Sequence, residues 1–297
     1  MRSKSAEAVA VAVGERSLHV VVVAFHGAPA LGRCLAALER AYPVVVVDNS
    51  DDEDVRAVAV AAGARYVPTG RNLGFGAGVN VALRELLDGR PCDVLLLNPD
   101  AVLGAAGVRA LVAALHRAGR PVGAATPRLV GPGGAGQRAV WPFPTPARAW
   151  LDAVGLGGMN RAPQFAVGTA LLLRWETVQE VGLFDESFFL YAEETDWQKR
   201  AYRLGWRPLE VGDVVAEHVG GGTSPDPLRR EALFHAGAET YIRKWHGRWG
   251  WTGYRAAQFA GAVVRAAVLR GSRRDAAAYR AWLYRQGPRR AAGLEVR

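Results

Sequence analysis

Three carboxylates stand close together in the stretch FFLYAEETDWQKR, residues 188–200, directly behind a run of aromatic and aliphatic side chains. They are Glu193, Glu194 and Asp196. Apolar surroundings and like-charged neighbours both raise the pKa of a carboxyl group toward the range in which it can act as a general base. On a helix that begins near residue 193, Glu193 and Asp196 lie on adjacent turns while Glu194 faces differently. The stretch is a candidate catalytic segment, although acidic residues also suit any helix N-terminus.

Oxygen-bearing side chains also end two apolar runs. Asp48 closes VVVVD, residues 44–48, where its carboxylate can accept hydrogen bonds from a base or a ribose, or can cap a following helix. Asn98 and Asp100 flank a proline at the end of DVLLLN, residues 93–98. Mg²⁺ and Mn²⁺ prefer oxygen ligands and usually take one or two protein carboxylates, whereas Asn-Pro-Asp is also an ordinary turn.

The elements that must position these side chains follow from the hydrophobic pattern. Runs that are apolar at every position predict strands covered on both faces. Leucines and valines at helical spacing fill the intervals between the first three runs, which predicts an α/β fold with a mostly parallel sheet flanked by helices. Ligands of such sheets bind at the carboxyl ends of the strands. The predicted strands are residues 19–25, 44–48, 93–98 and 165–174.

Two stretches are rich in glycine. GRNLGFGAGVN, residues 70–80, lacks the glycine that a dinucleotide fingerprint requires at position 79 and follows the second strand rather than the first. It therefore predicts only a turn into a helix, where the backbone can approach a ligand closely. The proline- and glycine-rich stretch 131–150 is predicted to be a mobile loop.

Composition narrows the class of protein. Half of the 297 residues are apolar, which allows a substantial core, and the formal charge of +9 favours contact with phosphate groups. Cys34 and Cys92 are too few for a disulfide framework, which points to a reducing cytoplasm. Residues 1–17 form a loose leader whose short apolar run is interrupted by charges, and no run reaches the roughly 18 apolar residues of a membrane span.

The stretch WTGYRAAQFAGAVVRAAVLR, residues 251–270, predicts a basic amphipathic helix. Such a helix can lie on an anionic membrane surface as a peripheral contact, or it can pack on the catalytic domain. A helical projection places Phe259, Val263, Val264, Ala267 and Val268 on one arc and Arg255, Gln258 and Arg265 on the other.

Taken together, several motifs resemble glycosyltransferase family 2, and above all its rhamnosyltransferase-like members, over roughly residues 18–245. In chain order they are VVVVAFHGAPALGRCLAAL, VVVVDNS, RNLGFGAGVN, LLLNPD, VGTALLLRWETVQEVGLFDESFFLYAEETDWQKRAYRLGW and AEHVGGGTS. The resemblance implies a GT-A fold, a Rossmann-like sheet with an acceptor-binding part and a C-terminal helical extension. It also implies inverting transfer of a sugar from a nucleoside diphosphate donor of dTDP or UDP type, with Mg²⁺ or Mn²⁺.

The implied organisation is a glycosyltransferase domain over residues 18–247 and a basic helical extension over residues 248–297. Within the domain, residues 18–125 would bind the nucleotide sugar and residues 126–247 the acceptor.

The resemblance further implies roles for single residues. Glu194, which stands where the family usually has aspartate, would be the general base. Asp100 and His218 would bind the metal, unless the His218 imidazole instead hydrogen-bonds the diphosphate, and Asn98 takes the first position of the family's DxD-type motif. The donor would contact Ala24, Phe25, Asp48, Arg71, Asn72, Asn80, Asn98 and Asp100. The acceptor or a phosphate would contact Glu193, Asp196 and Arg200, unless Asp196 and Arg200 pair with each other.

The main hypothesis is an enzyme that moves rhamnose from dTDP-rhamnose to a hydroxyl of a glycan or lipid-linked glycan, in cell wall or surface polysaccharide biosynthesis. One alternative is a nucleotidyltransferase, which normally carries a glycine-rich basic sequence where this chain has AFHGAPAL. The other is a non-catalytic basic module that binds a membrane surface. No nucleic-acid-binding motif is present in the sequence.

Overall fold

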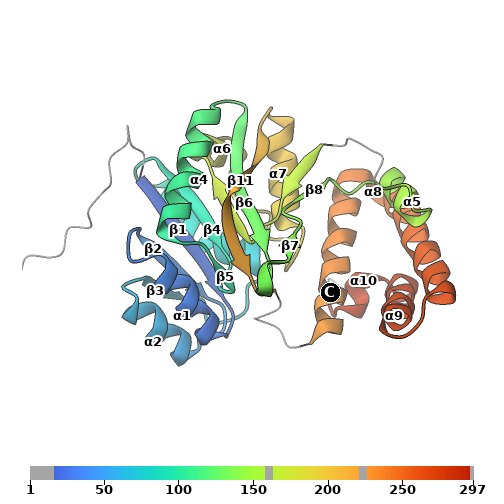
Figure 1. Ribbon diagram of the computed structural model, residues 1–297. Helices are drawn as coiled ribbons and strands as arrows, with labels where there is room; N and C mark the ends of the chain where they lie inside the picture. Colours follow the sequence, from blue (N-terminus) through green and yellow to red (C-terminus); the bar gives the residue numbers. More distant parts are fainter. Residues whose placement is uncertain (1–16, 158–162, 221–225, 295–297) are drawn as a thin grey trace, which may run out of the picture. The chain divides into compact units, whose positions relative to one another are not determined.

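The computed structural model describes residues 17–157, 163–220 and 226–294, and these form two compact units (Figure 1). The first, here called the sheet unit, takes in residues 17–141, 164–186 and 194–220. The second, the helical unit, takes in residues 142–157, 163, 187–193 and 226–294. The predicted leader therefore lies almost wholly outside the described residues. The predicted domain boundary at residues 247 and 248 falls at a break within a helix, inside the helical unit, whose last segment starts at Asp226.

One mixed sheet forms the centre of the sheet unit, in the strand order β3-β2-β1-β4-β10-β6-β11-β5 with β7 beside β6. The first four strands are parallel to one another, as are β6 and β11, whereas β10, β5 and β7 run antiparallel to their neighbours. The strands are β1 Ser17–Ala24, β2 Val44–Asp48, β3 Arg65–Pro68, β4 Cys92–Leu97, β5 Ala101–Val102, β6 Val122–Val130, β7 Gly136–Gln137, β10 Ala170–Leu173 and β11 Arg207–His218.

Helices cover both faces of this sheet, which confirms the interpretation of the uninterrupted apolar runs (Figure 1). Along β4, Leu95 and Leu97 point into one buried cluster while Val94 and Leu96 point into the other. Such a strand has no solvated face on which a polar residue would be favoured. The first cluster is covered by α1 Ala28–Ala37, α2 Glu53–Ala61 and α4 Ala105–Ala118, and the second by α3 Phe75–Leu87, α6 Trp175–Val181 and α7 Glu193–Arg203.

The single strand predicted over residues 165–174 is two strands. β9 Gln164–Ala166 pairs with β8 Val140–Pro142 in a separate two-stranded sheet, and β10 belongs to the large sheet. The chain changes partner between them, because the Val167 N–H donates to the Ala139 carbonyl while the Thr169 carbonyl accepts from the Asn98 N–H, each at 2.9 Å. Continuous hydrophobicity hides such a bend, since both halves are buried.

The loop predicted over residues 131–150 contains regular structure, so that prediction is wrong. Besides a short 3₁₀ turn, β7 and β8, it leads into the helix α5 Pro146–Ala153. The Thr145 hydroxyl caps this helix by accepting a hydrogen bond from the Arg148 N–H at 3.1 Å. Proline is favoured at the first position of a helix, so the prolines here begin structure rather than prevent it.

The helical unit is built on α8 Pro227–Val268, with α5, α9 Ser272–Gln286 and α10 Pro288–Ala291 packed on it. Gly247 breaks α8 with a φ of 65° and a ψ of −169°, a conformation open to glycine. Beyond the break, Trp251, Tyr254 and Tyr284 form a buried aromatic cluster. No helix in the described part of the chain is both long enough and apolar enough to cross a membrane.

Candidate active site

The pairing of β5 with β11 brings Asp100 and His218 together from distant parts of the chain. His218 lies opposite Ala101 in the antiparallel register, and the Val219 N–H donates to the Asp100 carbonyl at 3.2 Å. The His218 Nε2 consequently lies 3.5 Å from the Asp100 Oδ1. Both side chains are largely buried, at 19 % and 6 % exposure. The two residues predicted to bind a metal are therefore neighbours at one end of the sheet.

Gln137 on β7 orients the His218 ring. Its Nε2 donates to the His218 backbone carbonyl at 3.0 Å, so its Oε1, at 2.9 Å from Nδ1, must be an acceptor. In the neutral imidazole the proton therefore resides on Nδ1, which leaves the Nε2 lone pair available to a ligand. Histidine ligands of metals are commonly oriented by such a second hydrogen bond.

This donor set fits a divalent cation held by two protein ligands and a diphosphate. Among the described residues, no cluster of three or more His, Cys, Asp or Glu side chains offers a complete protein cage. Mg²⁺ and Mn²⁺ sites that hold nucleotides need only one or two protein ligands, because phosphate and water fill the other positions. The nitrogen of His218 suits Mn²⁺ better than Mg²⁺.

The turn that carries Asp100 is fixed by its backbone. The Asn98 carbonyl accepts hydrogen bonds from the Ala101 N–H at 3.0 Å and from the Cys34 thiol at 3.6 Å. Burial, with a smaller contribution from the charge of Asp100, raises the pKa of the Cys34 thiol to about 12. Cys34 is thus a packing residue without thiolate reactivity.

Glu194 lies in the first turn of α7 and is half-buried. Its position follows from the bend between β9 and β10: a Cβ placed on Gly168 would be 3.7 Å from the Glu194 Cγ and equally close to the Phe75 ring. Since the Thr169 carbonyl accepts from the Asn98 N–H, one bend lies beside Glu194 and is hydrogen-bonded to the turn before Asp100. The structure thereby connects the candidate base to the candidate metal ligands.

Gln198 attaches α7 to this bend. Its Oε1 accepts from the Ala166 N–H at 2.8 Å, and its Nε2 donates to the Ala166 carbonyl at 2.6 Å and to the Glu194 carbonyl at 3.2 Å. These bonds hold the turn that carries Glu194 against β9. Neither Gln198 nor Gln137 was predicted from the sequence, because a glutamine with these roles has no pattern of its own.

The prediction that Asp196 and Arg200 bind acceptor or phosphate is corrected by the structure, which favours the other interpretation, that they pair. The Asp196 side chain is 0 % exposed and its Oδ2 accepts from the Arg200 Nε at 3.1 Å. The same guanidinium donates to the Val181 carbonyl at 2.7 Å and to the Leu183 carbonyl at 2.8 Å. Arg200 therefore fastens α7 to the end of α6. Glu193 is also buried, at 3 % exposure, which leaves Glu194 as the accessible carboxylate of the three.

Asp48 is fully buried, and its carboxylate organises the loop after β2. Its Oδ1 accepts from the N–H and hydroxyl of Ser50, at 2.8 and 2.5 Å, and its Oδ2 accepts from the Asp52 N–H at 3.0 Å. The Tyr66 hydroxyl donates to the same oxygen at 2.9 Å. Burial, followed by this hydrogen bond, raises the pKa of Tyr66 to about 12. Asp52 caps α2, and contact of Asp48 with a base stays a prediction that requires one of these bonds to open.

The expectation that Asn80 contacts the donor is also corrected. Its side chain is 0 % exposed, and its Nδ2 donates to the Phe184 carbonyl at 2.9 Å and to the Glu186 carboxylate at 2.8 Å. Its Oδ1 accepts from the Phe184 N–H at 2.9 Å. Asn80 thus joins α3 to the segment after α6.

The remaining predicted donor residues lie at the carboxyl ends of β1 and on the turn into α3. Ala24 is buried, whereas the Phe25 ring is 37 % exposed beside the His26 ring. Arg71 and Asn72 are exposed, and the Asn72 Oδ1 accepts from the Gly74 N–H at 2.9 Å. An exposed aromatic ring and an exposed guanidinium suit a base and a phosphate, respectively, so these contacts stay predictions.

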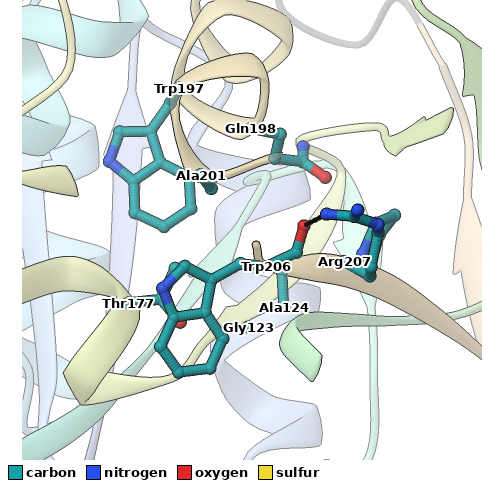
Figure 2. A pocket seen from close by; sticks show the side chains of 9 residues that line it. Gly123, Ala124, Thr177, Trp197, Gln198, Ala201, Trp206 and Arg207 are labelled. Atoms are coloured by element: carbon teal, nitrogen blue, oxygen red, sulfur yellow. Dashed lines mark hydrogen bonds between the residues drawn. The ribbon is translucent and has the colours of Figure 1, made fainter. Parts of the chain in front are cut away.

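A small cavity next to α7 is distinct from this candidate site (Figure 2). Trp197, Gln198 and Trp206 line it together with Thr177, and its volume is only about 10 Å³. That volume admits one water and no sugar. The buried Thr177 hydroxyl has no hydrogen-bond partner among the described residues, and a water in this cavity would supply one.

Comparison with known proteins identifies relatives. The profile of the family described as Glycosyl transferase family 2 matches residues 19–136. N-acetylglucosaminyl-diphospho-decaprenol L-rhamnosyltransferase of Mycobacterium tuberculosis is 29% identical, over 78% of this chain and 86% of the relative. The low-salt glycan biosynthesis hexosyltransferase Agl10 of Haloferax volcanii is 26% identical, over 63% of this chain and 62% of the relative.

Solved structures show the same fold. Glucosyl-3-phosphoglycerate synthase of M. tuberculosis, in complex with Mn²⁺, UDP-glucose and phosphoglyceric acid, aligns with a TM-score of 0.52 and 18% identity over 77% of this chain and 80% of that chain. GalNAc-T7 with UDP, GalNAc and Mn²⁺ aligns with a TM-score of 0.55 and 15% identity over 92% of this chain and 56% of that chain. These likenesses confirm the predicted fold.

Proposed function

The chain belongs to glycosyltransferase family 2 and is a glycosyltransferase, and on that premise we propose that it moves rhamnose from dTDP-rhamnose to a hydroxyl of a lipid-linked glycan, with inversion. The observation that carries this proposal is the bend at Gly168 and Thr169. It lies beside Glu194, whose Cγ would be 3.7 Å from a Cβ placed on Gly168, and it binds the turn of Asp100 through the Asn98 N–H. A displacement at a diphosphate-linked carbon requires a base for the acceptor hydroxyl and positive charge for the departing diphosphate, and this bend lies next to the candidate residues for both roles.

Asp100 and His218 would hold the divalent cation together with the donor diphosphate. When bound, the cation supplies positive charge that stabilises the departing diphosphate. The contribution of the chain is to present one carboxylate and one neutral imidazole in fixed orientation, the latter through Gln137. Mn²⁺ is present in the two solved structures compared above, which supports a cation in this role.

Glu194 would act on the acceptor. As the acceptor oxygen forms its bond to the anomeric carbon, the Glu194 carboxylate takes the hydroxyl proton, and the bond from that carbon to the diphosphate oxygen breaks. A single displacement of this kind inverts the anomeric centre. Gln198 and the Gly168 bend hold the carboxylate for this step, and such positioning reduces the entropic cost of reaction.

The choice of donor and acceptor rests on the mycobacterial relative, whose name specifies rhamnose and a glycan on a polyprenyl diphosphate. The formal charge of +9 is compatible with an anionic diphosphate-linked acceptor. Because such acceptors are held by lipid, we place the enzyme on the cytoplasmic face of a membrane as a peripheral protein.

The experiment is a transfer assay with dTDP-rhamnose and polyprenyl-diphospho-N-acetylglucosamine, with the product identified by mass spectrometry. Glu194→Gln should reduce turnover by a factor of about 10² to 10⁴. The same variant should retain donor binding in a thermal-shift titration. Glu210→Gln, at an exposed position of β11, is the matched control and should retain activity. Full turnover by Glu194→Gln would remove the assignment of the base, and no product with any rhamnosyl donor would remove the proposed substrate.

A further inference from the structure

The segment of α8 beyond Gly247 presents an uncharged face to solvent. Every exposed residue between positions 251 and 268 lacks a charge, and all but one are apolar. Surface helices of soluble proteins normally place charged residues on this side. The exposed residues are Thr252, Ala256, Phe259, Val263, Val264, Ala267 and Val268.

The arginines of the same segment are directed elsewhere. Arg255 donates to the carbonyls of Tyr284 and Arg285 at 2.7 and 2.8 Å, and Arg265 donates to the Asp152 carbonyl at 2.8 Å. The two charges thus bind backbone on the packed side of the helix. The apolar arc predicted from the sequence is present and its side chains are exposed, while the opposite side of the same helix packs within the helical unit.

The packed side of the segment is formed by other residues. Tyr254 and Ala257 are buried there, and Gly261 is so close to α5 that an added Cβ would lie 3.3 Å from the Ala153 Cα. Trp150 on α5 and Val154 directly after it are 46 % and 65 % exposed. The exposed face is therefore not needed for folding of the helical unit, and it keeps large apolar side chains for another purpose.

The two ends of the segment differ from its middle. Arg248 and Trp249 stand at its beginning, with Trp249 76 % exposed, and Arg270, Arg273 and Arg274 are exposed just after its end. A tryptophan and arginines around an apolar strip match the interface of an anionic bilayer, where aromatic rings and cations meet headgroups while aliphatic groups enter the acyl boundary. The charge of these ends argues for lipid over a second copy of the same basic chain, which would repel them.

We propose that this face, defined by Phe259, Val263, Val264 and Val268 and called here the apolar face, docks on the surface of an anionic lipid bilayer. The helix would lie in the plane of the interface with these side chains about 5–10 Å deep in the headgroup and acyl boundary. Arg270, Arg273 and Arg274 would contact the lipid phosphates. This inference does not depend on the proposed transfer reaction, since its test measures lipid binding rather than turnover.

The test is co-sedimentation of the full chain with vesicles of phosphatidylglycerol and phosphatidylcholine in equal parts, and with vesicles of phosphatidylcholine alone. The unaltered chain should bind the anionic vesicles and bind phosphatidylcholine weakly. The double variant Val263→Asp with Val264→Asp should weaken binding by about tenfold or more, because two charges replace inserted apolar groups. Val60→Asp, at a 61 % exposed position of α2, is the matched control and should bind like the unaltered chain.

Two further measurements test the role of the arginines and the folding of the variants. Arg273→Gln with Arg274→Gln should reduce binding to the anionic vesicles and leave the weak binding to phosphatidylcholine unchanged. Thermal unfolding must show that all variants stay folded, which the exposure of the altered residues leads us to expect. The proposal is overturned if the double aspartate variant binds vesicles like the Val60→Asp control. It is also overturned if sedimentation velocity shows that the apolar face instead joins two copies of the chain.

Discussion

Gln137 determines which nitrogen of His218 is available to a ligand. The glutamine amide binds both the ring and the backbone carbonyl of the histidine, which leaves Nε2, 3.5 Å from the Asp100 Oδ1, available to a ligand. Gln137 lies on β7 and His218 on β11, and these strands flank β6 on either side in the sheet. The orientation of a candidate metal ligand thus depends on a residue in a segment that seemed structureless in the sequence.

Replacing this glutamine should weaken binding that depends on the cation. Gln137→Leu removes both hydrogen bonds, and losses of such orienting partners typically reduce metal affinity by about 10- to 100-fold. Calorimetric titration with dTDP should show the loss in the presence of Mn²⁺ and little change without it. Gln179→Leu, at an exposed position of α6, is the control. Equal Mn²⁺-dependent affinities for the two variants would contradict the role given to Gln137.

Gly237 is predicted to be required because the segment that precedes Glu194 packs directly against it. A Cβ at this position of α8 would lie 2.3 Å from the Tyr191 carbonyl oxygen. Alanine gains about 1 kcal/mol of helix propensity over glycine, but a clash with backbone costs about 1–3 kcal/mol or more. Gly237→Ala should lower both the melting temperature and turnover, whereas Gly212→Ala, where nothing lies within 4 Å, should change neither. An unchanged Gly237→Ala enzyme would show that the loop yields easily.

Arg200 should matter for stability rather than for the acceptor. Arg200→Met removes three hydrogen bonds and leaves the buried Asp196 without its cation, which should cost about 3 kcal/mol in the free energy of unfolding. Denaturant unfolding measures this loss, and Arg117→Met, at an exposed position of α4, is the control. If the variant stayed stable but its KM for the acceptor rose, the prediction from the sequence would be right and the structural role wrong.

Acidification should destabilise the helical unit through His235. Burial lowers the pKa of this imidazole below 6.5, with Glu231 opposing the shift, and its Nδ1 lies 2.8 Å from the Tyr284 hydroxyl. Because the unfolded chain takes up the proton first, the stabilisation is complete above pH 6.5 and is lost as the pH falls toward the folded pKa. The melting temperature should therefore fall between about pH 7.5 and pH 5.

A variant isolates that contribution. His235→Gln should show a smaller decrease in melting temperature over the same pH range, while the decrease at lower pH that comes from Glu231 should persist. The pKa of Glu231 is lowered chiefly by the neighbouring His235, whose Nε2 lies 3.7 Å from the Glu231 Oε1, and then by Arg280, so Arg280 keeps part of that shift. Identical pH profiles for the variant and the unaltered chain would exclude His235 as the titrating group.

Much of the fold could be predicted because burial on both faces leaves a simple pattern. The strand at residues 44–48 has the predicted bounds, and β1 and β4 differ from the prediction by one or two residues. The bend at Gly168 could not be predicted, because a change of partner strand leaves hydrophobicity unaltered. The direction of the apolar arc on α8 could not be predicted either, since a projection gives the sides of a helix but not which side is packed.

The candidate site divides in the same way. Glu194, Asp100 and His218 each stand in a distinctive motif. In the structure the bend at Gly168 lies beside Glu194 and the turn of Asp100, and the pairing of β5 with β11 brings Asp100 and His218 together. Asn80 and Arg200 belong to the same motifs, yet their side chains hold the protein together. A motif contains residues that the fold needs as well as residues that the chemistry needs. Burial and hydrogen bonding in the structure are required to tell the structural residues from the functional ones.

The donor nucleotide is expected to bind through Asp100. The most direct test is thermal unfolding of the unaltered chain and of Asp100→Asn in the presence of dTDP, UDP or GDP. Each nucleotide is added with and without Mn²⁺. One nucleotide should stabilise the unaltered chain in a Mn²⁺-dependent manner, by about 2.7 kcal/mol at 100 times its dissociation constant, and should not stabilise the variant. Equal stabilisation of both proteins, or of neither by any nucleotide, would contradict the site.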